Sequence, residues 1–362
     1  MRLAVRMPPG PVLPFAAGRA PRLPLWAAPM AGGPSSTALL ATVGAAGGLG
    51  VLPGGYLTPE AFEQRLDALA AASPAPWAVN LFLPGPPTAD PEGVAAHAAA
   101  LGPLAAAHGV ALGEPRWEDD AIDAKVELLA GRRPAAVTLT FACPDPGLVG
   151  RLRDATGALV VATTTTPAEA AEATAAGVDA LTVQGSEAGG HRGAFRDDPA
   201  APGGGQLVPL LDLLRRTRAE TPLPLLAAGG LMSGADVRRA LDAGASGAQL
   251  GTAFLCTPEA GTSPTHRRAL LDRRYAGTTV TRAFTGRPAR GLANPMATAH
   301  PGAPSAYPEV HHLTRPLRAA AAEQGDPDAV HLWAGEGWRG VTEEPAGDLV
   351  RRIARDAGLG DG

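Results

Sequence analysis

Lysine is almost absent from this chain. Of its 31 basic residues only Lys125 is a lysine, and the others are arginines. A phosphate-binding P-loop needs a lysine beside a glycine-rich turn, and a Schiff-base enzyme needs a lysine in its pocket. Lys125 lies in an amphipathic stretch, residues 123–127, that is typical of a helix surface. The sequence therefore argues against both classes of protein.

Cysteines and long apolar runs are also scarce. Cys143 and Cys256 match no metal-ligand or redox spacing, so we expect reduced thiols in a cytoplasmic protein. No uninterrupted apolar stretch reaches the length of about 18 residues that a membrane span needs. Prolines break the N-terminal run after Arg2 and Arg6 before a signal-peptide core can form.

The charge balance indicates the kind of partner. A net charge of −4 gives no electrostatic reason to expect nucleic acid or an anionic membrane as partner. We therefore expect a small-molecule substrate, with no nucleic acid and no membrane bound. Monomer and homodimer both remain open.

Short apolar or β-branched runs alternate with helical stretches rich in Ala and Leu, the pattern of βα units around a parallel sheet. Strands are predicted at residues 25–30, 49–53, 77–83, 135–142, 158–165, 180–187, 224–230 and 247–255. Helices are predicted at residues 59–72, 92–108, 119–130, 167–176, 208–218 and 235–243. Eight units in one chain favour an α/β fold of the closed (β/α)8 TIM-barrel type over an open sheet.

The alternation of strands and helices stops after residue 255. Residues 262–340 hold aromatic, His and Pro residues in irregular order, whereas residues 345–357 form an amphipathic helical pattern with Gly358 as a natural stop. We predict a barrel over residues 1–261, a cap or substrate subdomain over 262–340, and a segment 341–362 whose helix returns to the barrel.

Glycines follow the last two predicted strands, at Gly229, Gly230 and Gly251. Reactive groups of a TIM barrel lie at the C-terminal ends of its strands, and glycines after strands seven and eight let backbone N–H groups approach a phosphate. A helix that begins near Gly234 would add a favourable dipole. Ordinary tight turns are the alternative, but the position in the barrel favours a phosphate site.

A histidine lies in the glycine-rich segment after the sixth predicted strand. His191 follows Gly189 and Gly190, and such a flexible backbone suits a loop better than a packed core. Because histidine has an ordinary pKa near neutrality, an imidazole over the barrel mouth can exchange a proton or hold a substrate charge. A structural role is the alternative, and we predict a catalytic one.

Five segments in register on successive strands resemble the FMN-dependent nitronate monooxygenases, once called 2-nitropropane dioxygenases. They are residues 28–34 (Ala-Pro-Met-Ala-Gly-Gly-Pro), 79–82 with Asn80, 184–191, 228–230 and 249–252. Residues 281–287 and 332–335 extend the resemblance into the predicted cap.

The resemblance implies a cofactor site and a reaction. FMN would be contacted by Ala28, Pro29, Met30, Asn80, Gln184, Gly189, Gly190, Gly229, Gly230, Gln249, Leu250, Gly251 and Thr252, and His191 would be the active-site histidine. The family oxidises alkyl nitronates, such as propionate 3-nitronate, with O2 to a carbonyl compound and nitrite. A nitronate is an electron-rich anion, so it needs an electron acceptor and a hydrogen-bond donor rather than a metal.

Three residues of the predicted cap are candidates for contacting the substrate. Tyr307, His311 and Arg315 are spaced four and four, so on a helix they share one face. A solvated helix face is the alternative. Family members often carry a second aromatic residue and a lysine here, so the His and Arg of this chain leave its substrate preference open.

Two other functions remain open. One is an NAD(P)H-dependent FMN reductase of quinones or enoyl thioesters on the same scaffold; the other is a barrel that binds a phosphate ligand without flavin, which would not require Asn80 and Gln184. The pair His311-His312 has no third ligand for a metal. The carboxylate pairs 119–120 and 197–198 are expected on the solvated surface.

Overall fold

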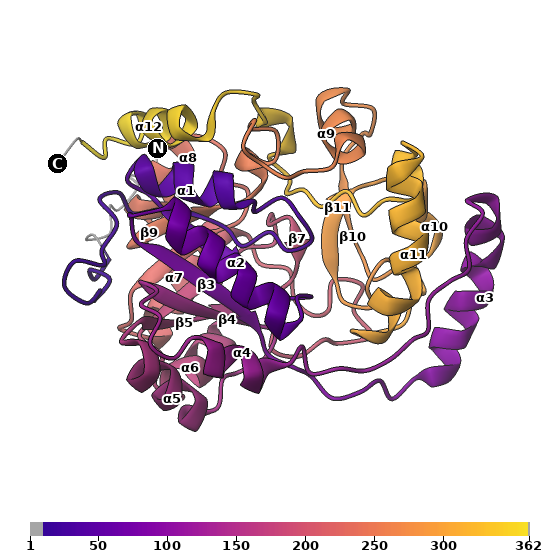
Figure 1. Ribbon diagram of the computed structural model, residues 1–362, viewed down its shortest axis with the longest axis horizontal. Helices are drawn as coiled ribbons and strands as arrows, with labels where there is room; N and C mark the ends of the chain where they lie inside the picture. Colours follow the sequence, from indigo (N-terminus) through magenta and orange to yellow (C-terminus); the bar gives the residue numbers. More distant parts are fainter. Residues whose placement is uncertain (1–9, 361–362) are drawn as a thin grey trace, which may run out of the picture.

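The computed structural model describes residues 10–360, and its centre is a closed barrel of eight parallel strands (Figure 1). The strands are β1 (Leu25–Ala27), β2 (Leu49–Pro53), β3 (Trp77–Phe82), β4 (Ala136–Thr140), β5 (Leu159–Thr164), β6 (Ala180–Gln184), β8 (Leu225–Ala228) and β9 (Gly247–Leu250). The ring closes where β1 pairs with β9 and Trp26 lies opposite Gln249. The predicted TIM barrel is confirmed. The N-terminal run around Arg2 and Arg6 lies outside the described residues.

Helices surround the barrel. They are α1 (Thr37–Ala45), α2 (Pro59–Ala72), α4 (Ile122–Leu128), α5 (Pro146–Thr156), α6 (Pro167–Ala175), α7 (Leu210–Glu220), α8 (Gly234–Asp242) and α12 (Ala346–Asp356). Thr58 and Thr166 cap α2 and α6 with their hydroxyls, each followed by a proline in the first turn. Helix α12 packs against α1 and α8 and completes the ring of helices. Within residues 10–360 no helix has the length and apolar character of a membrane span.

The barrel interior is filled at the end opposite the strand C-termini. Trp26, Leu49, Val51 and Leu226 are fully buried there, in a cluster that also includes Leu13 from the N-terminal segment. Such packing makes a barrel a core rather than a pore. A ligand can therefore approach only at the C-terminal ends of the strands.

A second lobe stands beside the barrel mouth (Figure 1). It holds the antiparallel sheet β10–β11–β7 and several helices: β7 (Gly190–His191), β10 (Thr278–Thr281), β11 (Ala289–Leu292), α3 (Pro91–Ala107), α9 (Pro264–Leu271), α10 (Pro295–Ala299) and α11 (Glu309–Glu323). Three 3-10 turns complete the chain: η1 (Thr252–Phe254), η2 (Pro327–Ala329) and η3 (Trp338–Gly340). Helix α3 follows barrel strand β3 in the sequence but packs against α11. The second lobe therefore also contains a segment from the first third of the sequence.

Several strands end earlier than the sequence predicts. β1 stops at Ala27 and β9 at Leu250, where the chain turns into η1. Pro29 has no N–H for a sheet ladder, and the apolar residues after Gly251 continue the run of a strand although their backbone is helical. Loops rather than strands therefore carry Met30 and Thr252 to the barrel mouth.

Lys125 is not on the surface, and this part of the sequence analysis was wrong. Its side chain is fully buried and its ammonium lies 2.8 Å from a carboxylate oxygen of Asp120. Asp120 and Ala121 have left-handed backbones, with φ of 58° and 52°, which delays the start of α4 to Ile122. The other oxygen of Asp120 accepts the backbone N–H of Tyr56 at 2.9 Å. Only the fold brings these groups together, so the sequence pattern of residues 123–127 alone cannot be distinguished from that of a solvated helix.

In the carboxylate pair at residues 197–198, Asp198 is exposed as expected, whereas the carboxylate of Asp197 is largely buried. Arg282, itself buried, donates to both oxygens of Asp197 at 2.9 and 2.6 Å and to the backbone oxygen of Asp198. Its partner Asp197 is 13% exposed. This ion pair ties the loop after β7 to the turn after β10.

Candidate active site

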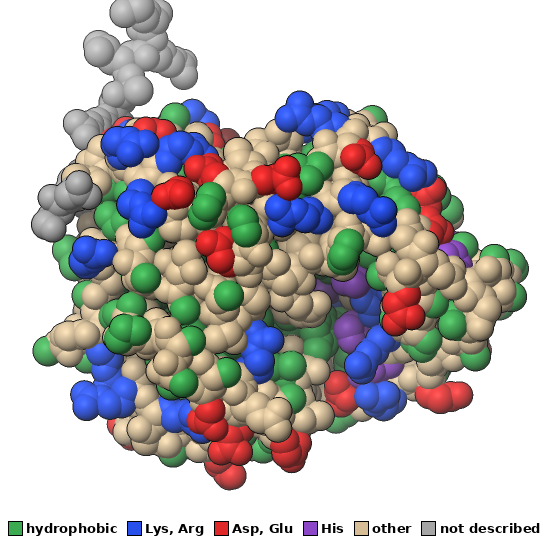
Figure 2. All heavy atoms as spheres, turned by 45° about the horizontal axis from the view of Figure 1, so that its top comes forward, with side chains coloured by type: hydrophobic (Ala, Val, Ile, Leu, Met, Phe, Trp, Pro, Cys, Tyr) green, Lys and Arg blue, Asp and Glu red, His purple; other side chains and the backbone are tan. Residues whose placement is uncertain are grey.

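A cavity of about 640 Å³ opens between the C-terminal ends of the barrel strands and the second lobe. In Figure 2, histidine side chains lie within a hollow between the two lobes, with arginine or lysine side chains close by. The volume is within the range of about 300–1,000 Å³ that is usual for cofactor and substrate pockets. All thirteen residues expected to contact FMN line this cavity: Ala28, Pro29, Met30, Asn80, Gln184, Gly189, Gly190, Gly229, Gly230, Gln249, Leu250, Gly251 and Thr252.

The loops after β8 and β9 present backbone donors to the cavity. Gly229 and Gly230 have φ of +118° and +69°, a region that side chains other than glycine rarely adopt. Within residues 10–360 no hydrogen bond engages the backbone N–H of Gly230 or Gly251. These donors can accordingly serve an anionic ligand group.

The N-terminus of α8 is capped by its own side chains, and Ser233 and Gly234 do not line the cavity. The Asp236 carboxylate accepts the backbone N–H groups of Met232 and Ser233 at 3.0 and 2.9 Å, and the Ser233 hydroxyl caps the helix in return. This capping box satisfies the N–H groups of Ser233 and Asp236, and the expected contribution of the helix dipole to an anion site stays a prediction.

Several polar atoms that line the cavity are buried without a partner. Gln249 Oε1 and Thr182 Oγ1 make no hydrogen bond within the described chain. The amide nitrogen of Asn80 is held by the hydroxyls of Thr138 and Thr140 at 2.9 and 3.0 Å, which fixes the orientation of its side chain. Because buried polar groups are nearly always paired, the unpaired atoms indicate a ligand that carries polar groups of its own. FMN is a ligand of this kind.

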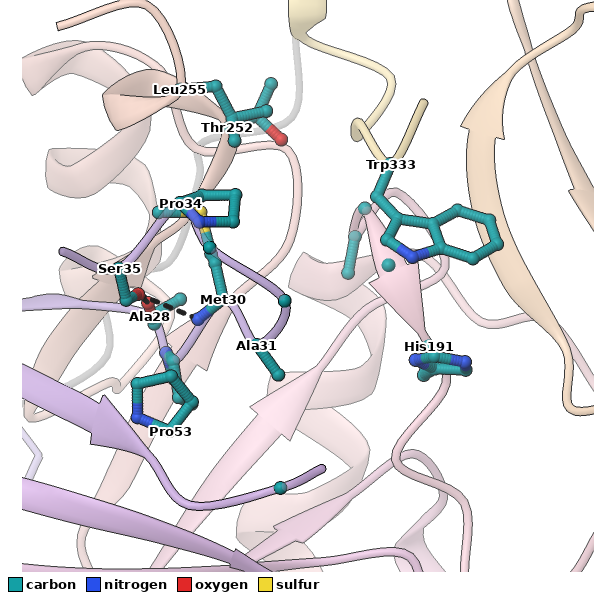
Figure 3. Close-up of a pocket in the computed structure, with 18 of the residues that line it drawn as sticks. Ala28, Met30, Ala31, Pro34, Ser35, Pro53, His191, Thr252, Leu255 and Trp333 are labelled. Carbon is teal, nitrogen blue, oxygen red and sulfur yellow. Dashed lines mark hydrogen bonds between the residues drawn. The ribbon is translucent and has the colours of Figure 1, made fainter. Parts of the chain in front are cut away.

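His191 reaches the cavity from the second sheet rather than from the barrel. Its backbone pairs with Ala289 of β11, and Gln184 fixes the loop by donating to the His191 carbonyl at 3.0 Å and accepting the Gly193 N–H at 2.8 Å. In Figure 3 the imidazole and Trp333 face Met30 across the cavity. The histidine is therefore not packed in the core.

The imidazole of His191 is neutral at pH 7. Burial, together with the charges of Arg287 and Arg318, lowers its pKa to about 3. Its Nε2 lies 2.9 Å from the Thr285 hydroxyl, whose own proton is donated to the Arg287 carbonyl at 3.3 Å. When the Thr285 proton goes to this carbonyl, Nε2 is the donor to the hydroxyl and Nδ1 is left to accept a hydrogen bond.

Strained aromatic residues form one wall of the cavity. Phe141 and Tyr56 both line it with left-handed backbones, at φ of 91° and 68°. The Arg287 guanidinium lies 4.1 Å from the centre of the Phe141 ring, and the Tyr56 ring stacks on His311 at 4.1 Å. Non-glycine residues in this backbone region are costly and concentrate at functional sites.

The three predicted substrate residues do not share a helix face. Tyr307 precedes α11, and its ring lies 5.9 Å from that of His191 and 5.4 Å from that of Phe141. His311 and Arg315 are on α11 and line the cavity, whereas Tyr307 packs behind its wall. The expected face was wrong because Tyr307 lies outside the helix.

Several residues that line the cavity escaped the sequence analysis: Tyr56, Phe82, Phe141, His266, Arg318, His331 and Trp333. They come from loops and from both lobes, and no spacing in the sequence connects them. The segments 79–82 and 332–335, which carry part of the family resemblance, contain Phe82 and Trp333 and were the available signal.

Comparisons with known proteins agree on one family. A family model described as nitronate monooxygenase matches residues 20–356. A nitronate monooxygenase from Pseudomonas aeruginosa is 38% identical over 347 residues, covering 92% of this chain and 95% of that protein. A probable nitronate monooxygenase from Staphylococcus saprophyticus subsp. saprophyticus is 34% identical and covers 93% and 95%. These matches confirm the resemblance seen in the sequence.

Solved structures show the same architecture. The structure of a nitroalkane oxidase from Streptomyces ansochromogenes superposes with a TM-score of 0.90 at 45% identity, covering 94% of this chain and 97% of that one. FabK from Thermotoga maritima superposes with a TM-score of 0.72 at 21% identity, covering 94% of each chain. The second similarity concerns the fold alone.

Proposed function

The chain belongs to the nitronate monooxygenase family, and we propose on this basis that it is a flavin-dependent oxidoreductase that oxidises alkyl nitronates. We propose further that the flavin is FMN and that O2 converts the nitronate to a carbonyl compound and nitrite. The observation that carries the proposal is the single cavity in which the glycine loops after β8 and β9 lie together with His191.

The residues of the cavity fit FMN. The free N–H groups of Gly230 and Gly251 would hold its phosphate, and the unpaired Gln249 Oε1 and Thr182 Oγ1 would bond its polar groups. The flavin, when bound, supplies the electron acceptor that no side chain of the protein can provide.

The charges around His191 favour a substrate that arrives as an anion. An imidazole with a pKa of about 3 is a weak base, so it is poorly matched to removing a proton from a neutral nitroalkane. It can still orient a bound anion through hydrogen bonds. Arg315 and Arg318 line the same cavity and give it a positive potential. These groups suit a preformed nitronate.

Two further proposals concern the second lobe and the location of the protein. We propose that residues 262–340 form a substrate cap, since β7 with His191 is a strand of their sheet. We propose a cytoplasmic location, consistent with the free thiols of Cys143 and Cys256.

Spectra and oxygen uptake test the proposed function. We expect the purified protein to show flavin absorbance, to release FMN on denaturation, and to consume O2 with propyl-2-nitronate while forming nitrite. Rapid anaerobic bleaching by NADH without nitronate turnover would replace the proposal by the reductase alternative. Absence of flavin absorbance even after incubation with FMN would favour a barrel for another phosphate ligand.

Substitution of Gly230, in the glycine loop after β8, is expected to weaken FMN binding. In Gly230→Ala the alanine must adopt φ of +69°, and its Cβ would lie 3.0 Å from Glu187 Cβ. Such strain costs roughly 1–2 kcal/mol, so we expect FMN affinity, measured by flavin fluorescence, to fall about tenfold. Gly177→Ala is the matched control, because Gly177 has φ of +85°, open space around it and no place in the cavity. Equal losses of affinity in both variants would contradict the assignment.

A further inference from the structure

Arg318 is a buried cation in the cavity wall, and no salt bridge joins it to a carboxylate of the described residues. Arg318 on α11 lines the cavity and is only 6% exposed. Burial lowers its pKa to about 10, so it remains charged at neutral pH, and no carboxylate contributes to this pKa. Two other buried arginines of the described chain are neutralised, Arg282 by Asp197 and Arg290 by Glu336. Arg287 is buried without an ion pair too, but backbone oxygens accept its N–H groups and it does not line this cavity. A desolvated charge without a counterion is costly, which indicates a missing anion.

The hydrogen bonds of Arg318 set the protonation of two histidines. Its guanidinium donates to Thr314 Oγ1 at 2.9 Å, to the His311 carbonyl at 2.9 Å, and to Nδ1 of both His311 and His331 at 3.3 Å. A guanidinium has no acceptor, so each Nδ1 must accept. Burial and the charge of Arg318 lower the pKa of both histidines, which keeps them neutral. Each imidazole therefore carries its proton on Nε2.

The result is a group of donors on one side of the cavity. His311 and His331 both line it, and each offers an Nε2–H. The Nη1 group of Arg318 makes a single hydrogen bond, so its second N–H remains available. Arg315, one turn earlier on α11, adds a second positive charge to the same wall. No carboxylate forms an ion pair with Arg318 anywhere in residues 10–360.

We propose that Arg318, His311 and His331 form a subsite for a planar anion with two oxygens. This inference rests on the proposed function and names residues that select its substrate. The remaining N–H of the guanidinium and the two flanking Nε2–H donors can bond the oxygens of a carboxylate or a nitronate group. The anion is either the nitronate group itself or a carboxylate elsewhere on the same molecule. Arg318 also acts as a positioning residue, because it decides which nitrogen of each imidazole is the donor.

Nitrogen NMR of the wild-type holoprotein tests the tautomers with Arg318 unchanged. In protein labelled with 15N-histidine we expect His311 and His331, assigned by His311→Gln and His331→Gln, to be protonated on Nε2 only. Sodium nitrite, a planar anion with two oxygens, should shift both Nε2–H resonances. A proton on Nδ1 of either residue, or no shift at saturating nitrite, would overturn the proposal.

Variants of Arg318 test whether its positive charge binds the anion. We expect the nitrite dissociation constant, followed by the flavin spectrum, to rise at least about tenfold in Arg318→Met. We expect a smaller rise in Arg318→Lys, which keeps the charge but loses the planar guanidinium that bonds both imidazoles. Arg267→Met is the matched control, because Arg267 lies on α9, outside the cavity, and pairs with Glu343. If Arg318→Met fails to fold, Arg318→Lys and the NMR measurement decide. Wild-type nitrite affinity in folded Arg318→Met that retains flavin would refute the subsite.

Two substrates separate the two possible anions. A higher KM of Arg318→Lys for both propyl-2-nitronate and propionate 3-nitronate identifies the nitronate group as the bound anion. A higher KM for propionate 3-nitronate alone identifies the carboxylate. Unchanged KM values for both count against the proposal. Nitrite binding needs no turnover, so a protein that binds nitrite through Arg318 but oxidises no nitronate contradicts the proposed function and leaves the subsite intact.

Discussion

Replacing His191 with alanine is expected to lower kcat/KM for alkyl nitronates by roughly a hundredfold or more, with FMN still bound. The imidazole is the only titratable group of the glycine-rich segment that lines the cavity, and it faces Met30 across the space where a ligand fits. The loop itself should survive, because Gln184 holds it through the His191 carbonyl and the Gly193 N–H, which the substitution leaves in place.

Two further variants separate the possible roles of this side chain. His300→Ala is the matched control, because His300 belongs to the same lobe but does not line the cavity, and we expect wild-type activity from it. His191→Asn keeps a hydrogen-bond donor without a group that titrates near neutrality. Substantial activity in His191→Asn with loss in His191→Ala would indicate hydrogen bonding rather than proton transfer. Wild-type rates in His191→Ala would exclude a catalytic role.

The pH dependence of nitronate oxidation follows from the lowered pKa of His191. Because the charged form appears only as pH falls toward about 3, this group should cause no change in kcat/KM for a preformed nitronate between about pH 5 and 8. We expect a flat profile there, measured by oxygen uptake with the substrate added as the anion. An inflection near the ordinary histidine pKa of about 6.5 that disappears in His191→Asn would show that the imidazole is solvated in the working enzyme.

Replacing Lys125 with methionine is expected to lower the free energy of unfolding by about 3–5 kcal/mol at pH 8, the usual result of removing one partner of a buried ion pair. Lys125 is fully buried and Asp120 is 14% exposed, so the carboxylate would lose its counterion without gaining full solvation. Asp120 also holds the backbone of Tyr56, whose ring stacks on His311 in the cavity wall. We therefore expect substrate affinity to fall as well. Urea unfolding and KM measure the two effects.

The pH dependence of this loss has a definite sign. Burial raises the pKa of Asp120 to about 6 even beside Lys125, above its unfolded value of about 3.9. The folded protein thus binds more protons than the unfolded chain between those values, and the contribution of Asp120 to stability falls as pH rises through them. Without Lys125 the pKa rises further, so the deficit of Lys125→Met should shrink toward pH 5.

Two matched variants accompany this substitution. Lys125→Met combined with Asp120→Asn removes both charges and should recover part of the lost stability. Arg151→Met breaks the nearby exposed pair with Asp123, whose side chains are 58% and 73% exposed, and should cost at most about 1 kcal/mol. A deficit of Lys125→Met that is the same at pH 5 and 8, and that the double variant does not reduce, would show that lost packing rather than the unpaired charge is responsible.

The local order of the residues was enough to predict the barrel and the glycine loops. Alternation of apolar strands with capped helices is a short-range pattern, so β2 and α2 were predicted at their observed limits. Glycines at Gly229 and Gly230 mark backbone conformations that depend on the residue itself. Strand ends were less accurate, because the apolar run after Gly251 continues into η1.

The sequence by itself determined the barrel, the glycine loops after β8 and β9, and the position of His191 in a glycine-rich segment, since each depends on neighbours along the chain. Only the tertiary structure decided which charged side chains are buried and which groups they contact. Lys125 is buried because a left-handed turn at Asp120 brings its partner to it, and Arg318 meets His331 because α11 and the chain after η2 lie together beside the barrel mouth. Burial and electrostatic pairing are sums over the whole fold, and no local pattern records them.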